Sequence, residues 1–129
     1  LGKMISFFVE GMPDINPEDF EYKGASSDQQ VRVLQFSLWL MESDLDWDSQ
    51  ALQQALVGLA ERMDIRIRDF LKPLFIAISG KPVSPPLFDS LVVLGPEISR
   101  GRLRHALGIL GGVSKKKLKK LDAEFRSLS

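Results

Sequence analysis

The chain has 129 residues, 44% of them hydrophobic, with seventeen basic and seventeen acidic side chains and no cysteine. This composition is typical of a globular protein with one modest core, and the absence of cysteine excludes disulfides, thiolate metal sites and thiol nucleophiles. No apolar run approaches the ~20 residues that cross a membrane, and the first residues lack a signal-peptide pattern. We expect a cytoplasmic protein with no membrane contact.

The zero net charge hides two oppositely charged halves. Residues 1–60 contain three cations and ten acids, a net charge of −7, whereas residues 61–129 contain fourteen cations and seven acids, a net charge of +7. A basic half is the electrostatic pattern expected for a phosphate-bearing partner. The alternative interpretation is that the acidic half docks on the basic half.

The first third of the chain predicts two helical stretches separated by a break. Lys3–Val9 has the composition of a helix end, and the glycine and proline residues in Glu10–Ser26 predict a loop with at most one short turn. Helical spacing of apolar residues then predicts a helix over Asp28–Glu42 with Ser27 as its N-cap. These apolar residues are Val31, Leu34, Leu38 and Met41.

The middle of the chain predicts two further helices. An amphipathic helix over Ser49–Met63, capped by Asp48, follows the acidic connector Ser43–Trp47. A turn precedes the next helix, at about Ile67–Ser79. Because proline disrupts a helix interior but fits its first turn, Pro73 predicts a regular helix that begins only near Lys72. Its expected stop is Gly80.

The last third contains three helix start signals and two stop signals. Ser84-Pro85-Pro86 predicts the start of a short helix that ends at Gly95. Pro96 or Ser99 starts another helix, which continues to about Leu110 and stops at the Gly111-Gly112 pair, and Ser114 opens a last helix. Since no segment alternates with period two, the predicted class is all-α. Short helices joined by Gly/Pro turns should form a compact, superhelical stack.

Catalytic and metal-ligating patterns are missing from the sequence. His105 is the single histidine, and it has no Glu at the spacing of a metal pair. Ser79-Gly80-Lys81 lacks the spacing of a phosphate loop. Asp44, Asp46 and Asp48 lack the Gly and distal Glu of a calcium loop. We therefore expect no catalysis and no cofactor in this chain alone.

Basic and aromatic residues provide a distributed binding signal instead. Arg100 and Arg104 share one helix face, while Arg102 points elsewhere. Arginine suits phosphates and guanine edges, and phenylalanine offers a stacking surface for unpaired bases. The alternatives are a solvated charged face and core packing of the aromatic rings. The candidates beyond Arg100 and Arg104 are Arg66, Arg68, Lys72, Lys81, Phe75 and Phe88.

A run of lysines opens the last helix, and its role has three interpretations. Contact with an RNA backbone, an anionic membrane surface and a solvated tail all fit the pattern. The apolar side of this helix is narrow and is followed by acids, so membrane contact ranks last. The lysines are Lys115, Lys116, Lys117, Lys119 and Lys120.

The segment Ile67–Leu107 has the sequence IRDFLKPLFIAISGKPVSPPLFDSLVVLGPEISRGRLRHAL. This segment resembles the C-terminal anticodon-binding region of bacterial glutamyl-tRNA synthetases. The resemblance covers most of the chain, is diffuse before Trp47, and contains nothing of that enzyme's catalytic half. It implies two helical subdomains, with residues 1–46 ending the first and residues 47–129 forming the second. It also implies a longer protein that uses ATP and Mg²⁺ to attach glutamate to tRNA.

The resemblance implies roles for particular residues as well. Ser84, Pro85, Leu87 and Phe88 occupy the segment that approaches the anticodon bases in the family. Phe75 stands where the family usually has an anticodon-contacting arginine, which a phenyl ring cannot imitate. The implied partners are the tRNA anticodon arm and a catalytic domain in the same chain, in a monomeric protein. The competing hypothesis is a helical protein–protein module that self-associates through its acidic and basic halves.

Overall fold

The computed structural model describes residues 15, 17–21, 26–43, 45–79 and 87–128, and within these ranges it contains helices and no strands. A 3-10 turn, η1 (Pro17–Phe20), precedes five α-helices. They are α2 (Ser27–Glu42), α3 (Ser49–Arg62), α4 (Ile67–Ser79), α5 (Leu87–Ile109) and α6 (Lys115–Ser127). The all-α prediction is confirmed. The predictions for Lys3–Val9, Gly80 and Ser84-Pro85-Pro86 fall outside the described residues.

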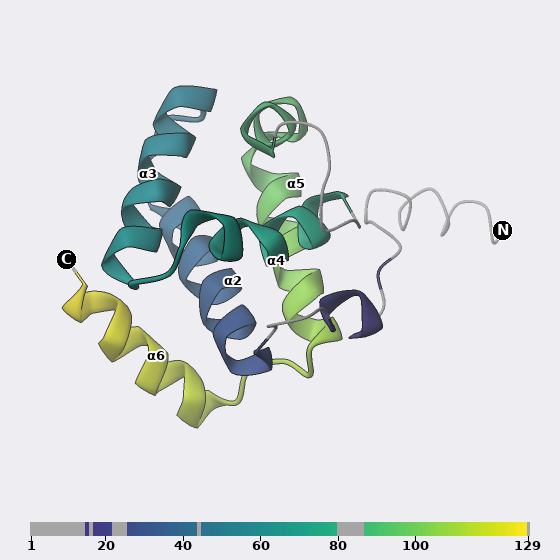
Figure 1. The fold of residues 1–129 in the computed structure, drawn as a ribbon, viewed down its shortest axis with the longest axis vertical. Helices are drawn as coiled ribbons and strands as arrows, with labels where there is room; N and C mark the ends of the chain where they lie inside the picture. Colours follow the sequence, from purple (N-terminus) through teal and green to yellow (C-terminus); the bar gives the residue numbers. More distant parts are fainter. Residues whose placement is uncertain (1–14, 16, 22–25, 44, 80–86, 129) are drawn as a thin grey trace, which may run out of the picture.

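The helices pack around one hydrophobic core (Figure 1). α2 and α5 lie alongside each other, α4 crosses both, and α6 lies against the outer side of α2. Each large apolar side chain that is fully buried contributes roughly 1.5–3 kcal/mol, so the interior faces of α2 to α5 account for most of the stability. Fully buried examples are Phe36, Leu52, Phe70, Leu91 and Leu103.

Three helices begin at side-chain caps. Asp48 Oδ1 accepts a hydrogen bond from the Ala51 amide at 2.8 Å, and Ser114 Oγ accepts one from Lys117 N at 3.1 Å, so both predicted caps are confirmed. The prediction for α2 was wrong by one residue, because Ser26 is the cap and Ser27 is already helical. Either serine has a suitable hydroxyl, and the extended backbone of Ser26 decides which one caps.

Pro73 lies inside a continuous helix. The prediction that regular helix begins near Lys72 was wrong, since α4 begins at Ile67. A proline at this position cannot donate to the carbonyl of Asp69, which normally costs about 3 kcal/mol or more. Burial of Pro73 and of the apolar residues around it offsets this cost. Those neighbours are Phe70, Leu74, Ile76, Ala77 and Ile78.

Gly95 divides α5 into two helical segments. Its φ of 85° and ψ of 166° are non-helical, and glycine adopts this conformation without strain from a side chain. Pro96 begins the second segment, where a missing N–H costs little. The predicted stop at Gly95 is therefore confirmed. The indole Nε1 of Trp47 donates to the Leu91 carbonyl at 2.8 Å, which fixes the first segment against the chain that enters α3.

The division at residue 46 stays a prediction. α2, which precedes that position, packs against both α4 and α5, and the hydrophobic core contains side chains from either side of it. The part of the chain that the structure describes contains no helix that is long and apolar enough to span a membrane.

Candidate nucleic-acid interface

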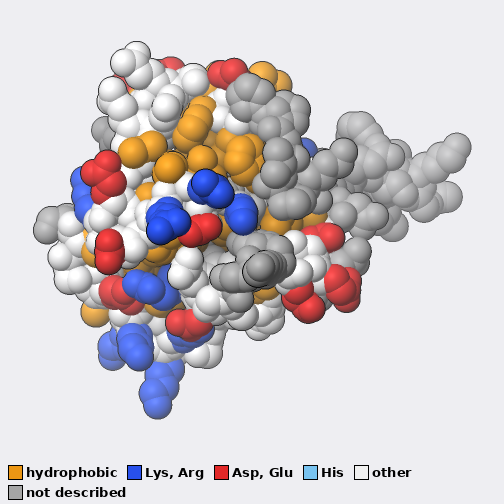
Figure 2. Space-filling view, in the orientation of Figure 1, with side chains coloured by type: hydrophobic (Ala, Val, Ile, Leu, Met, Phe, Trp, Pro, Cys, Tyr) orange, Lys and Arg blue, Asp and Glu red, His pale blue; other side chains and the backbone are white. Residues whose placement is uncertain are grey.

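Arg66, Arg68 and Lys72 form a cationic group at the start of α4, here called the α4 cations. Arg66 and Arg68 are exposed, and Lys72 is half-buried one turn further on. Figure 2 shows Lys and Arg side chains gathered over α4, next to an area of hydrophobic side chains between α3 and α5. The structure thus places positive charge beside apolar surface. Phosphates and unstacked bases require this pair of features.

The two candidate stacking aromatics lie at the margin of the core. Phe75 on α4 and Phe88 on α5 are each partly buried and pack against core residues, so both rings retain some exposed surface. Leu87 differs, since it is 3% exposed and belongs to the core itself. Its structural role is to anchor the start of α5. Lys81, Ser84 and Pro85 lie outside the described residues.

The three arginines of α5 all reach neighbouring helices. Arg100 Nη1 donates to the Met41 carbonyl at 3.2 Å, and Arg104 Nη2 pairs with Glu42 Oε2 at 3.1 Å. Arg100 and Arg104 therefore share the face toward the end of α2, as predicted, whereas Arg102 donates to the Ile78 carbonyl near the end of α4. A helix C-terminus carries partial negative charge, so cations stabilise it.

Arg102 and Arg104 differ in how far their side chains are exposed to solvent. Desolvation lowers the pKa of Arg102, although a guanidinium stays protonated at neutral pH. The Arg104 side chain is 55% exposed and forms a solvent-screened ion pair. Sequence reasoning placed Arg100 and Arg104 among phosphate ligands and missed their contacts with helix ends. The sequence feature that could have indicated these contacts is that each arginine directly follows a residue that is buried, Ser99 or Leu103.

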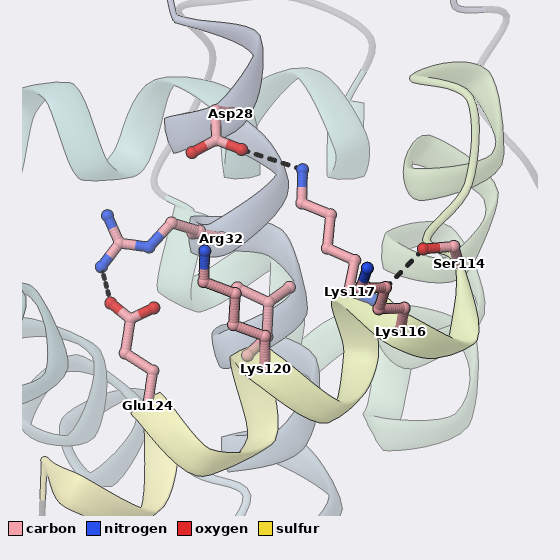
Figure 3. Close-up of a pocket in the computed structure, with 8 residues that line it drawn as sticks. Asp28, Arg32, Ser114, Lys116, Lys117, Lys120 and Glu124 are labelled. Atoms are coloured by element: carbon pink, nitrogen blue, oxygen red, sulfur yellow. Dashed lines mark hydrogen bonds and ion pairs between the residues drawn. The ribbon is translucent and has the colours of Figure 1, made fainter.

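A second basic region lies between α2 and α6, here called the α2–α6 cleft (Figure 3). Its cavity of about 630 Å³ is lined by Asp28, Arg32, Ser114, Lys116, Lys117, Lys120, Leu121 and Glu124. Two ion pairs cross it. Lys117 Nζ lies 2.8 Å from Asp28 Oδ1, and Arg32 pairs with Glu124. The Lys117 ammonium, through its hydrogen bond and its charge, lowers the pKa of Asp28, with smaller contributions from Arg32 and Lys120.

Among the described residues, no group of three or more His, Cys, Asp or Glu side chains could hold a metal ion. His105 is half-buried on α5.

The fold and the charge distribution define an all-α domain with basic groups on its surface, and the comparison with known families specifies its class. Residues 1–107 match the family described as anticodon binding domain. The chain therefore belongs to the anticodon-binding domain family. Helix α6 follows the matched residues, so it lies beyond the part that the family describes.

The relatives of the chain are glutamate–tRNA ligases, as the resemblance predicted. The ligase of Psychrobacter cryohalolentis is 42% identical over 122 residues, which are 95% of this chain and 24% of that protein. The ligase of Marinobacter nauticus is 41% identical over 97% of this chain and 25% of its own length. That of Acinetobacter baylyi is 44% identical over 88% and 22%. The chain thus spans about a quarter of these relatives and matches their C-terminal part.

Proposed function

We propose that this chain is the anticodon-binding part of a glutamate–tRNA ligase, and that the whole protein attaches glutamate to tRNA with ATP and Mg²⁺. The supporting observation is the 42% identity to such a ligase across 95% of the chain. Catalysis would belong to a domain upstream in the same protein, and the chain alone would be inactive. The proposed setting is the cytoplasm, and the proposed state is a monomer.

In this proposal the α4 cations position the RNA backbone. Arg66 and Arg68 are exposed, so their guanidinium groups can approach phosphates. Phe75 on α4 and Phe88 on α5 each keep a partly exposed ring on which an unpaired base could stack. Phosphate contacts set the orientation and base contacts set specificity. Lys81, Ser84 and Pro85, which precede α5 in the sequence, complete the proposed base-reading segment with Leu87 as its buried anchor.

Arg100 and Arg104 have a supporting role in this proposal. Arg100 holds the end of α2 through the Met41 carbonyl, so its contribution to RNA binding would be indirect. Arg104 is more exposed and can exchange Glu42 for a phosphate at little cost, because exposed ion pairs are weak. Replacement of each by glutamine should therefore weaken RNA binding less than replacement of Arg66 and Arg68.

Phe75 replaces a cation that the family usually has at this position. We propose that stacking by the ring substitutes for hydrogen bonding, while Arg68 and Lys72 supply the charge. The test is Phe75→Arg, with discrimination measured between a glutamate tRNA and the same tRNA with an altered anticodon. An unchanged discrimination ratio would exclude a role for this position.

A salt titration of tRNA binding tests the main proposal. The affinity of the chain for a glutamate tRNA transcript should fall by roughly 0.7 log units per decade of salt for each phosphate contact on a single strand. The double variant Arg66→Gln/Arg68→Gln should bind more weakly and show a shallower slope. Arg126→Gln is the control, because Arg126 lies on α6 and pairs with Asp122. Binding that depends neither on salt nor on the Arg66→Gln and Arg68→Gln substitutions would refute the proposal.

The self-association hypothesis has no support from the comparisons, and one experiment separates it from RNA binding. Sedimentation at two salt concentrations reports whether the chain forms dimers through its acidic and basic halves. Dimers at low salt, together with no tRNA binding, would favour self-association over the proposed function.

A further inference from the structure

The α2–α6 cleft contains more positive charge than its own carboxylates neutralise. Four cationic residues line it against two acids, Asp28 and Glu124. Lys117 pairs with Asp28, and Arg32 pairs with Glu124, so both acids are already occupied. Lys116 and Lys120 are exposed and form no ion pair among the described residues. Two positive charges at the cleft therefore remain uncompensated by its own acids.

Helix termini add to this positive potential. α2 begins at Ser27 and α6 at Lys115, and the first turns of both helices border the same cavity through Asp28 and Ser114. Each helix N-terminus carries about half a positive charge. Figure 3 shows the Lys120 side chain extending from α6 toward α2, in the space between the two ion pairs. The cleft thus combines two exposed ammonium groups with two positive helix ends.

The way α6 is attached leaves this cleft accessible. Near its other end, the Phe125 ring contacts the rings of Phe36 and Trp39 on α2, with centroids 5.3 and 5.5 Å apart. Leu121 is the one residue of α6 that is fully buried. Apolar packing is thus concentrated toward the C-terminal half of the helix, and in the lysine-rich first turns the ion pair of Lys117 with Asp28 crosses to α2. Ion pairs on a surface can rearrange around a ligand.

We propose that the α2–α6 cleft binds a backbone phosphate of the RNA, with Lys116 and Lys120 as its ligands, at a site separate from the α4 cations. The cleft lies on α2 and α6, and α6 follows the residues that match the anticodon-binding family. Phosphate is the chemical class that multiple ammonium donors and helix N-termini favour. A cavity of 630 Å³ is within the size range of ligand pockets. This inference rests on the proposed function, and it extends the RNA path to the end of the chain.

The same helix offers a matched control for this proposal. Lys115 and Lys119 have the same charge and are also exposed, but they do not line the cleft. A helix turns by about 100° per residue, so Lys115 and Lys119 share one side of α6 and Lys116 and Lys120 share another. Lys116→Gln/Lys120→Gln and Lys115→Gln/Lys119→Gln therefore remove equal charge from one helix with nearly equal helix propensity.

The experiment measures binding of a glutamate tRNA transcript to the full chain and both double variants over a range of salt concentrations. Removing one phosphate ligand should reduce the salt slope by roughly 0.7 and the affinity at 0.1 M salt by about fivefold. The cleft variant should show this reduction for one or for both of its two lysines. The control variant should bind tRNA within about twofold of the unmodified chain. Circular dichroism checks that both variants fold.

The outcomes separate this inference from the proposed function. Equal reductions in the two double variants, or no reduction in either, would overturn the cleft as a phosphate site. If Arg66→Gln/Arg68→Gln still weakens binding in those cases, the proposed function stands without the cleft. If the unmodified chain does not bind tRNA, the proposed function fails, and the inference fails with it.

Discussion

Helices α5 and α6 are both basic, but they use their cations differently. In α5, Arg100 and Arg102 donate hydrogen bonds to carbonyl groups at the ends of α2 and α4, and Leu103 is fully buried. In α6, by contrast, most lysines are exposed, and only Leu121 is fully buried. The guanidinium group is planar and weakly hydrated, which suits partly buried contacts, whereas the ammonium group is strongly hydrated and favours the surface.

This difference shows that the density of positive charge in a sequence does not reveal which charges are free to bind. The second half of the chain has a net charge of +7. Part of that charge holds helix ends together, and part of it faces solvent. The contrast in packing between the two helices can be tested first, because its expected effect is largest.

The largest expected effect is a loss of core packing in α5. Leu103→Ala removes a side chain with 0% exposure and should lower the free energy of unfolding by about 2–5 kcal/mol. Leu121→Ala, at 3% exposure on α6, should cost less, because α6 can separate from α2 without opening the rest of the core. Urea unfolding of the two variants measures both values. Equal losses would mean that α6 unfolds together with the body.

Removal of a partly buried guanidinium should have the next largest effect. Arg102→Met keeps much of the apolar stem but leaves the Ile78 carbonyl at the end of α4 without this donor. Hydrogen bonds from charged groups contribute about 1.5–3 kcal/mol, so the free energy of unfolding should fall by an amount in this range. Lys119→Met on α6 is the control, and it should change stability by less than about 0.5 kcal/mol.

Many of these features follow from local sequence signals. The caps Asp48 and Ser114 and the break at Gly95 depend on one or two residues, and the sequence predicted each of them. One other feature required tertiary information. Pro73 would normally end a helix, and only its burial shows why α4 continues through it.

The candidate site was less predictable than the fold, because contacts between distant helices decide it. No local pattern indicates that Arg102 reaches a carbonyl 24 residues earlier or that Arg32 pairs with Glu124, 92 residues later. The lysine run was visible in the sequence, but the α2–α6 cleft requires Asp28 and Arg32 from another helix. Charge patterning predicted an anionic partner, and the packing of α2 against α6 forms the cleft that we propose as a binding site.

Acidic pH should have a smaller effect, which is to weaken the attachment of α6 to α2. Lys117 holds the pKa of Asp28 below its usual value, so the folded chain binds this proton less readily than the unfolded chain does. The stabilisation is therefore present above about pH 4 and is lost as the pH falls through the lowered pKa of the folded state. Amide hydrogen exchange in α6 should accelerate relative to α5 over this range.

Asp28→Asn provides the control for the acid experiment. The variant lacks the titrating carboxylate, so its α6 amides should exchange faster already at neutral pH and should depend less on acidification. Because the Asp28 side chain is 70% exposed, solvent screens the pair and the change should be modest. If the α6 amides of the unmodified chain kept the same protection relative to α5 down to about pH 2, below the range in which the carboxylate titrates, the ion pair would have no part in holding α6.

The smallest effect should come from replacing Arg104. Because Arg102 and Arg104 lie on the same helix, comparing their losses of stability tests most directly whether burial sets the contribution of an arginine. Arg104→Met breaks an ion pair in which the arginine is 55% exposed and Glu42 is 39% exposed, so the expected cost is about 0.2–1 kcal/mol. A double-mutant cycle with Glu42→Gln isolates the pair energy, and added salt should reduce it. A pair energy equal to the loss in Arg102→Met would show that burial does not distinguish these arginines. The expected small value would leave Arg104 free to exchange its carboxylate for a phosphate.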